Sequence, residues 1–82
     1  MPKLPRDISG RELARLLKKY GYQVSREVGS HIRLESSFRG QDHRITIPDH
    51  SEVKIGTLNN ILNEVAAYLG VSKFDLAKNL FA

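Results

Sequence analysis

Hydrophobic and polar residues alternate along the 82-residue chain with two different periods. A repeat of three to four positions is typical of helices, and a repeat of two is typical of half-buried strands. The first period predicts helices over about residues 10–20, 56–69 and 73–81. The second period predicts strands over residues 22–28, 31–36 and 43–47. Ser9 and Ser72 each open a capping box, which favours a helix start directly after each serine.

Each predicted helix carries one apolar stripe that would face a core. The stripe of the first helix comprises Leu13, Leu16, Leu17 and Tyr20. The stripe of the second comprises Leu58, Ile61, Leu62, Val65 and Leu69. The stripe of the third comprises Phe74, Ala77, Leu80 and Phe81.

The strand alternation assigns side chains to the two faces of a sheet. In the first strand the predicted inward residues are Tyr22, Val24 and Val28. Arg26 falls at an inward position too and is the one residue of that set that is not apolar, whereas Glu27 is predicted outward. In the second and third strands, aliphatic residues face inward. The predicted outward residues of these two strands are His31, Arg33, Arg44 and Thr46.

The element order α-β-β-β-α, followed by a terminal helix, predicts an α+β fold. Short connections and one-sided strands imply a three-stranded antiparallel sheet with the helices on one face. The other face would then be open to water. The same order occurs in double-stranded-RNA-binding domains, an analogy at the level of the fold alone.

Charge is distributed unevenly along the chain, whose net charge is +4. Residues 1–47 carry 10 basic and 5 acidic residues, whereas residues 48–82 carry 3 basic and 4 acidic ones. A basic face suits a polyanionic partner, although a generic solubilising surface would give the same totals. Cysteine is absent, and no apolar run approaches the length of a membrane span. We therefore expect a cytoplasmic protein without a membrane partner.

His31 is the main candidate for chemistry, because it follows the turn residues Gly29 and Ser30 and is predicted on the open face. A neutral imidazole is the common general base near pH 7. Arg33 and Arg44, predicted to flank it, would disfavour the imidazolium and could hold a phosphate. RNA supplies its own nucleophile, the 2′-hydroxyl, so that no metal is required. The alternative is an inert surface histidine on a strand.

Other residues are candidates for contact with RNA. Gly29 would let a backbone approach, and the Ser30 hydroxyl could bond phosphate oxygens. Lys18 and Lys19 add positive charge on the first helix, and His50 lies just past the third strand. His50 could also be a second acid–base group, or simply a loop histidine. No histidine pair has a zinc-site spacing, so that neither a metal nor a cofactor is expected.

Five short motifs occur in order along the chain. They are Ser9-Gly10-Arg11-Glu12 with Leu16-Leu17, Gly21-Tyr22, Gly29-Ser30-His31, Ile47-Pro48-Asp49-His50 and Ile55-Gly56-Thr57-Leu58. With these motifs the sequence resembles the HicA toxins, the mRNA interferases of type II toxin–antitoxin systems. The resemblance covers about residues 7–70 and implies a single domain over 1–82, with 71–82 as a C-terminal helical extension.

The resemblance implies a double-stranded-RNA-binding-like fold, metal-independent endonucleolytic cleavage of mRNA, growth arrest and neutralisation by a HicB-type antitoxin. The catalytic histidine of the family falls on His31, and the histidine after proline falls on His50, whose role stays open. The sequence departs from the family at Ile32, where many members have a further polar residue or histidine. Its tail from Gly70 to Ala82 also extends beyond the shortest members.

Two other functions are compatible with the sequence. The first is a non-catalytic RNA-binding module of the same fold, in which His31 only contacts a phosphate or a 2′-hydroxyl. The second is a protein-interaction module whose basic face meets an acidic partner, which is also what an antitoxin would do.

Overall fold

The protein is described by a computed structural model that covers residues 4–81. Its elements are α1 (Gly10–Leu17), the 3-10 turn η1 (Lys18–Tyr20), β1 (Gln23–Val28), β2 (His31–Ser36), β3 (His43–Pro48), α2 (Ile55–Leu69) and α3 (Lys73–Phe81). The order and type of the elements match those predicted from the sequence. The first predicted helix differs in its last turn, which is a 3-10 turn rather than α-helix.

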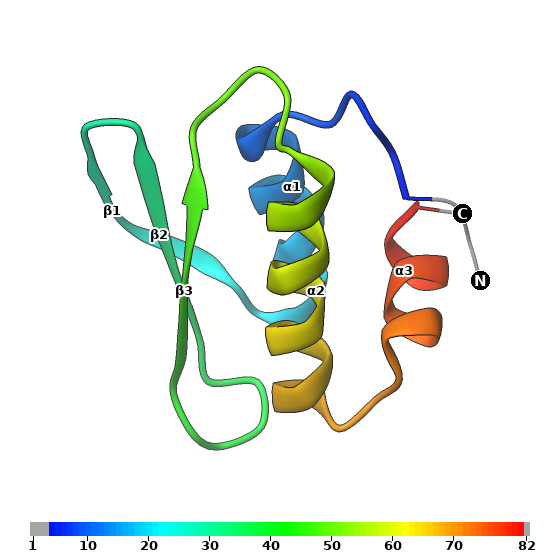
Figure 1. Cartoon of the computed structure of the whole chain (residues 1–82). Coiled ribbons are helices and arrows are strands. Elements are labelled where there is room, and N and C mark those ends of the chain that lie inside the picture. The colour runs from blue at the N-terminus through cyan, green and yellow to red at the C-terminus, as the bar shows by residue number, and fades with distance from the viewer. Residues whose placement is uncertain (1–3, 82) are drawn as a thin grey trace.

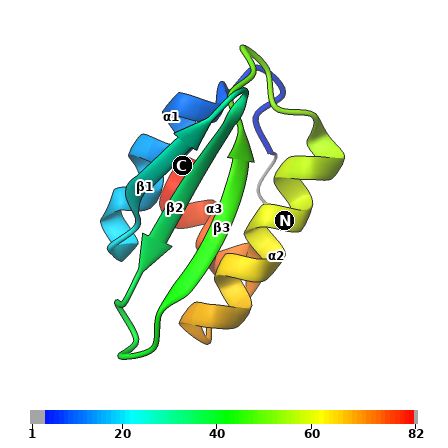
Figure 2. The same ribbon diagram turned by 90° about the vertical axis from the view of Figure 1, so that its left-hand side faces the viewer.

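The strands form one antiparallel sheet in the order β1-β2-β3, and the helices lie on one side of it. Figure 1 shows the sheet at the left, α1 and α2 beside it, and α3 on the far side of these two helices. Figure 2 looks onto the uncovered face of the sheet, with the helices behind. This arrangement confirms the predicted α+β fold and leaves one face of the sheet open.

The core lies between the sheet and the helices. The predicted stripe of α2 is buried throughout, because these five side chains share one helical face that meets the sheet. The sheet contributes Ile32 and Leu34 from β2 and Ile45 and Ile47 from β3. Burial of these apolar side chains is the main driving force that holds the two layers together.

In α3 the capping prediction is correct and one core prediction is wrong. The Ser72 hydroxyl accepts a hydrogen bond from the Asp75 amide at 3.0 Å, which is the serine half of the predicted capping box. The buried face of α3 is formed by Leu76, Ala77 and Leu80. Phe74, predicted in the core, is 45% exposed, because it precedes Leu76 by two residues and so lies on roughly the opposite side of the helix.

The first strand is the main departure from the predicted fold. All of β1 is exposed, because it is an edge strand whose hairpin with β2 curves away from the helices (Figure 1). The pairing with β2 slips between Val24 and Arg26, so that Ser25 forms a β-bulge. Residues directly opposite each other on paired strands point to the same face of the sheet. Because Ser25 is an extra residue, the alternation of inward and outward side chains is reversed after it. Val28, predicted inward, therefore faces the open side, and Glu27, predicted outward, faces the helices.

The N-terminus of α1 is packed against the chain that leaves β3. The Gly10 amide donates to the His50 carbonyl oxygen at 3.0 Å. A methyl group on Gly10 would overlap the Pro48 carbonyl oxygen, whereas one on Gly56, in the first turn of α2, would meet nothing within 4 Å. Gly10 is therefore required for close approach of α1 to β3.

We predict that Gly10→Ala destabilises the protein by roughly 1–3 kcal/mol, because the added methyl must displace backbone rather than a flexible side chain. Gly56→Ala is the matched control and should stabilise by about 0.4–1 kcal/mol, since alanine reduces the entropy of the unfolded chain. Urea unfolding of both variants measures the two free energies. Equal stability of the Gly10→Ala variant and the wild-type protein would contradict the packing described.

Candidate functional site

The histidine of interest begins β2 directly after a two-residue hairpin turn. Val28 and His31 are paired across the turn formed by Gly29 and Ser30. Gly29 has φ of 59°, and Ser30 does not have a positive φ, a pattern typical of a type II′ turn. A methyl group on Gly29 would meet nothing within 4 Å, so the glycine is needed for its backbone conformation rather than for close packing.

An open cavity of about 470 Å³ lies on the uncovered face of the sheet. It is lined by His31, Arg33, Thr46, Arg26 and Val28. The register accounts for this set, because Val28 is opposite His31, Arg26 is opposite Arg33, and Arg33 is opposite Thr46. The predicted placement of His31, Arg33 and Thr46 on one open face is confirmed, and the exposed histidine lies beside two arginines.

Arg26 and Val28 are cavity residues that the sequence prediction did not assign. Both were expected on the inner face, where Arg26 broke an otherwise apolar alternation. The bulge at Ser25 moves both to the open face. A charged residue interrupting an apolar strand pattern was therefore the available signal for the bulge.

Arg44 shares the open face but does not flank His31, contrary to the sequence prediction. It is opposite Glu35, and its Nε donates to Glu35 Oε1 at 2.8 Å. This hydrogen bond is the main reason why the pKa of Glu35 lies below its ordinary value. Arg44 lies outside the cavity, and its charge is already paired; Arg26 occupies the flanking position instead.

The two lysines predicted to contact RNA lie away from the cavity. Lys18 borders a groove between α1 and β1, together with Arg15 and Val24. Lys19 Nζ donates to the Asn79 carbonyl oxygen of α3 at 3.0 Å. The structure thus does not bring Lys18 or Lys19 together with His31.

The segment after β3 supports the turn that carries His31. The Asp49 amide donates to the Ser30 carbonyl oxygen at 2.6 Å. Pro48 is opposite His31, so that His50, which is exposed, follows two residues beyond that pair. His50 is therefore near the same end of the sheet as His31.

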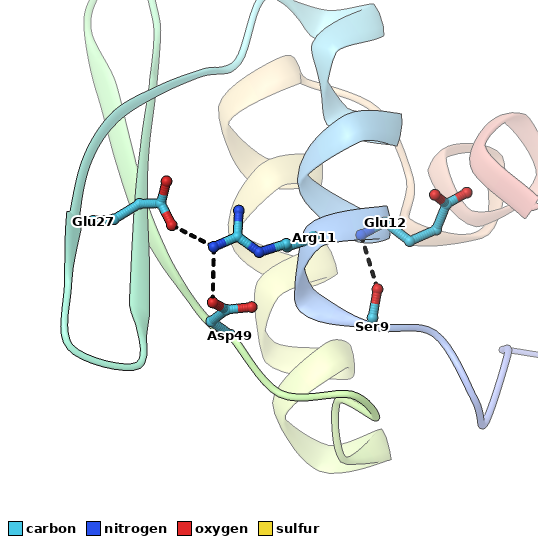
Figure 3. Close-up of polar contacts among 5 residues, drawn as sticks. All are labelled: Ser9, Arg11, Glu12, Glu27 and Asp49. Atoms are coloured by element: carbon cyan, nitrogen blue, oxygen red, sulfur yellow. Dashed lines mark hydrogen bonds and ion pairs between the residues drawn. The ribbon is translucent and has the colours of Figure 1, made fainter.

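Arg11 of α1 joins three segments that are distant in the sequence (Figure 3). Its Nη2 donates to Glu27 Oε1 of β1 at 2.6 Å and to Asp49 Oδ2 at 3.0 Å. The hydrogen bond to Glu27 is the largest cause of a raised pKa for Arg11, which stays cationic. This bridge ties the hairpin and the end of β3 to the first helix.

His43 has a structural position at the opposite end of β3. Its Nδ1 lies 2.6 Å from the Tyr22 hydroxyl oxygen, and its ring stacks on Tyr68 with 4.7 Å between centroids. Tyr22 is fully buried, and burial is the main cause that raises its pKa. His43 is therefore an aromatic packing residue remote from the cavity.

Fold and site together define a small α+β protein with a histidine and two arginines on the open face of an α-β-β-β-α sheet. The chain belongs to the HicA toxin family: the family described as "HicA toxin of bacterial toxin-antitoxin" matches residues 10–66. It is thus a toxin of a toxin–antitoxin system, and the family implies a cognate antitoxin as partner. Comparison with curated proteins and with solved structures gives no match. Within the described residues, no helix has the length and apolarity needed to cross a membrane.

We predict that Arg11→Ala raises amide hydrogen exchange in residues 27–31 on the order of threefold, because the ion-pair bridge to Glu27 and Asp49 is lost. Arg15→Ala is the control, since Arg15 is also exposed on α1 but pairs with Glu12 inside the same helix. The measurement is native-state exchange followed by NMR. Identical exchange of the hairpin in both variants would show that the bridge does not hold it.

Proposed function

We propose that the protein is a metal-independent endoribonuclease that cleaves mRNA, with His31 as the general acid–base group. The observation that carries this proposal is the position of His31, exposed in one cavity with Arg26 and Arg33. An imidazole beside two guanidinium groups supplies a proton acceptor together with phosphate binding. Cleavage of mRNA accounts for arrest of translation and growth by a toxin acting in the cytoplasm.

The proposed reaction begins with transfer of the 2′-hydroxyl proton to the neutral imidazole of His31. The 2′-oxygen forms a bond to phosphorus, and the bond from phosphorus to the 5′-oxygen breaks. The departing oxygen takes up a proton from water, and the imidazolium of His31 returns its proton to the solvent, so that the products carry a 2′,3′-cyclic phosphate and a 5′-hydroxyl. Positive charge from Arg33 and Arg26 stabilises the negative charge that grows on the phosphate oxygens.

The remaining RNA contacts follow from distance to the cavity. Gly29 and Ser30, both exposed, form the turn next to His31 and are proposed to meet the phosphate on one side. His50, past the paired residue Pro48, is proposed as a further contact at the same end. Lys18, Lys19 and Arg44 lie outside the cavity and would contact only a longer RNA.

We propose a HicB-type protein as the antitoxin. A basic, solvent-exposed site is blocked most directly by an acidic surface of a partner protein. A small HicB-like reading frame beside this one would support the pairing. The whole chain is proposed as one domain, since Leu76 and Leu80 of α3 belong to the same core cluster as α1, α2 and the sheet.

We predict that His31→Ala lowers the rate of RNA cleavage roughly 100- to 10,000-fold, because the general base is lost. RNA affinity should stay within a few-fold and stability within about 0.5 kcal/mol, since His31 is exposed. Cleavage of labelled RNA, with and without EDTA, and growth arrest on expression are the measurements. The wild-type protein should cleave equally well in EDTA, and His50→Ala shows whether a second imidazole contributes.

Undiminished cleavage by His31→Ala would contradict the catalytic assignment. RNA binding without cleavage by the wild-type protein would instead favour a non-catalytic RNA-binding module. Absence of RNA binding even at low salt would favour a module that binds only protein.

A further inference from the structure

Two arginines stand directly opposite each other on the open face. Arg26 of β1 is paired with Arg33 of β2, and directly opposed residues have neighbouring side chains on one face. Like charges in this position destabilise a sheet. Among residues 4–81, the ion pairs of arginine involve Arg11, Arg15 and Arg44, and neither member of this pair. The fold thus places two like charges side by side at its surface, and among these residues neither arginine forms an ion pair with a carboxylate.

The repulsion is a product of the bulge rather than of the strand pattern. Without the slip at Ser25, Arg26 would share the face of Val24, toward the helices. The Ser25 hydroxyl donates to the Arg33 carbonyl oxygen at 3.3 Å, which links the bulged residue to the strand opposite. Bulges commonly occur where a strand must redirect a side chain at a functional site.

The surroundings of the two arginines suit one phosphate group. Both line the cavity that contains His31, and Val28, which is 52% exposed, forms an apolar wall opposite the histidine. Residues two apart on a strand are separated by about 7 Å, so that both guanidinium groups can reach a phosphate placed at His31. A guanidinium binds phosphate through two parallel N–H donors, and two such groups can hold one phosphate from both sides.

We propose that Arg26 and Arg33 form a clamp for a single phosphodiester, and that Arg26 binds the RNA phosphate directly and holds it beside His31. The proposal rests on the proposed function for its substrate. Binding of the anion would relieve the repulsion between the arginines. Arg26 acts by binding the phosphate and stabilising its negative charge, and it transfers no proton.

A double-mutant cycle tests whether the arginines share one phosphate. It uses the 82-residue chain with His31→Ala to prevent cleavage, and a short labelled single-stranded RNA as the probe. Arg26→Gln and Arg33→Gln should each weaken binding on the order of tenfold. Each should also reduce the slope of log affinity against log salt by about 0.7. The RNA affinity of the double variant should be no more than about twofold below that of either single variant, because the first change already removes the shared phosphate contact.

Arg15→Gln is the control, since it removes the charge of another exposed arginine, which lies on α1. Equal affinities of Arg26→Gln and Arg15→Gln would overturn the clamp. Multiplicative losses in the double variant would also overturn it, because they would mean two independent phosphate contacts.

Thermal unfolding in the absence of RNA separates a binding role of Arg26 from a structural one. Arg26→Gln should have a Tm equal to or above that of the parent, because the like-charge repulsion is removed. Inorganic phosphate, compared with sodium chloride at the same ionic strength, should raise the Tm of the parent more than that of Arg26→Gln. A lowered Tm together with an unchanged response to phosphate would assign Arg26 to the fold and overturn the proposal.

The outcomes also separate this proposal from the proposed nuclease. If the wild-type protein cleaves RNA while Arg26→Gln binds RNA as Arg15→Gln does, the clamp alone is refuted. The wild-type protein could instead bind RNA without cleaving it, while the affinity losses of Arg26→Gln and Arg33→Gln do not multiply in the double variant. In that case the clamp stands and the proposed nuclease activity is refuted.

Discussion

The register slip at Ser25 is the constraint on which the candidate site depends. One extra residue in β1 exchanges the faces of every side chain that follows it. Arg26 and Val28 are thereby placed beside His31 on the open face, and Glu27 is turned toward α1, where it pairs with Arg11. A single irregularity thus builds the cavity and attaches the hairpin that bears it.

The attachment matters because β1 contributes nothing buried to the core. The hairpin is held instead by polar contacts that join distant parts of the chain: Arg11 to Glu27 and Asp49, and Asp49 to the backbone of Ser30. Since the helices cover only the other face of the sheet, the core and the candidate site do not compete for the same residues. Such a division allows a small domain to expose a basic face without weakening its packing.

Much of the fold could be predicted from local sequence. Apolar periodicity predicted all three helices and all three strands, and the serine caps at Ser9 and Ser72 are formed as expected. The face that carries His31 and Arg33 followed from alternation. The other residues around His31 could not be predicted from alternation. The bulge that brings Arg26 and Val28 to this face is set by pairing between strands, and Arg44 is paired with Glu35 across the sheet. Phe74 was misplaced because tertiary packing against α2 chose a different face of a short helix.

The proposed RNA site on the open face is tested most directly by mapping where RNA contacts the protein. Chemical-shift mapping by NMR, with the His31→Ala protein and a short single-stranded RNA, measures this residue by residue. We predict that the largest changes occur at the cavity positions on the open face, namely Arg26, Val28, Arg33, Thr46 and residue 31 itself. The largest changes on α1, α2 or α3, with the open face unaffected, would contradict the central claim.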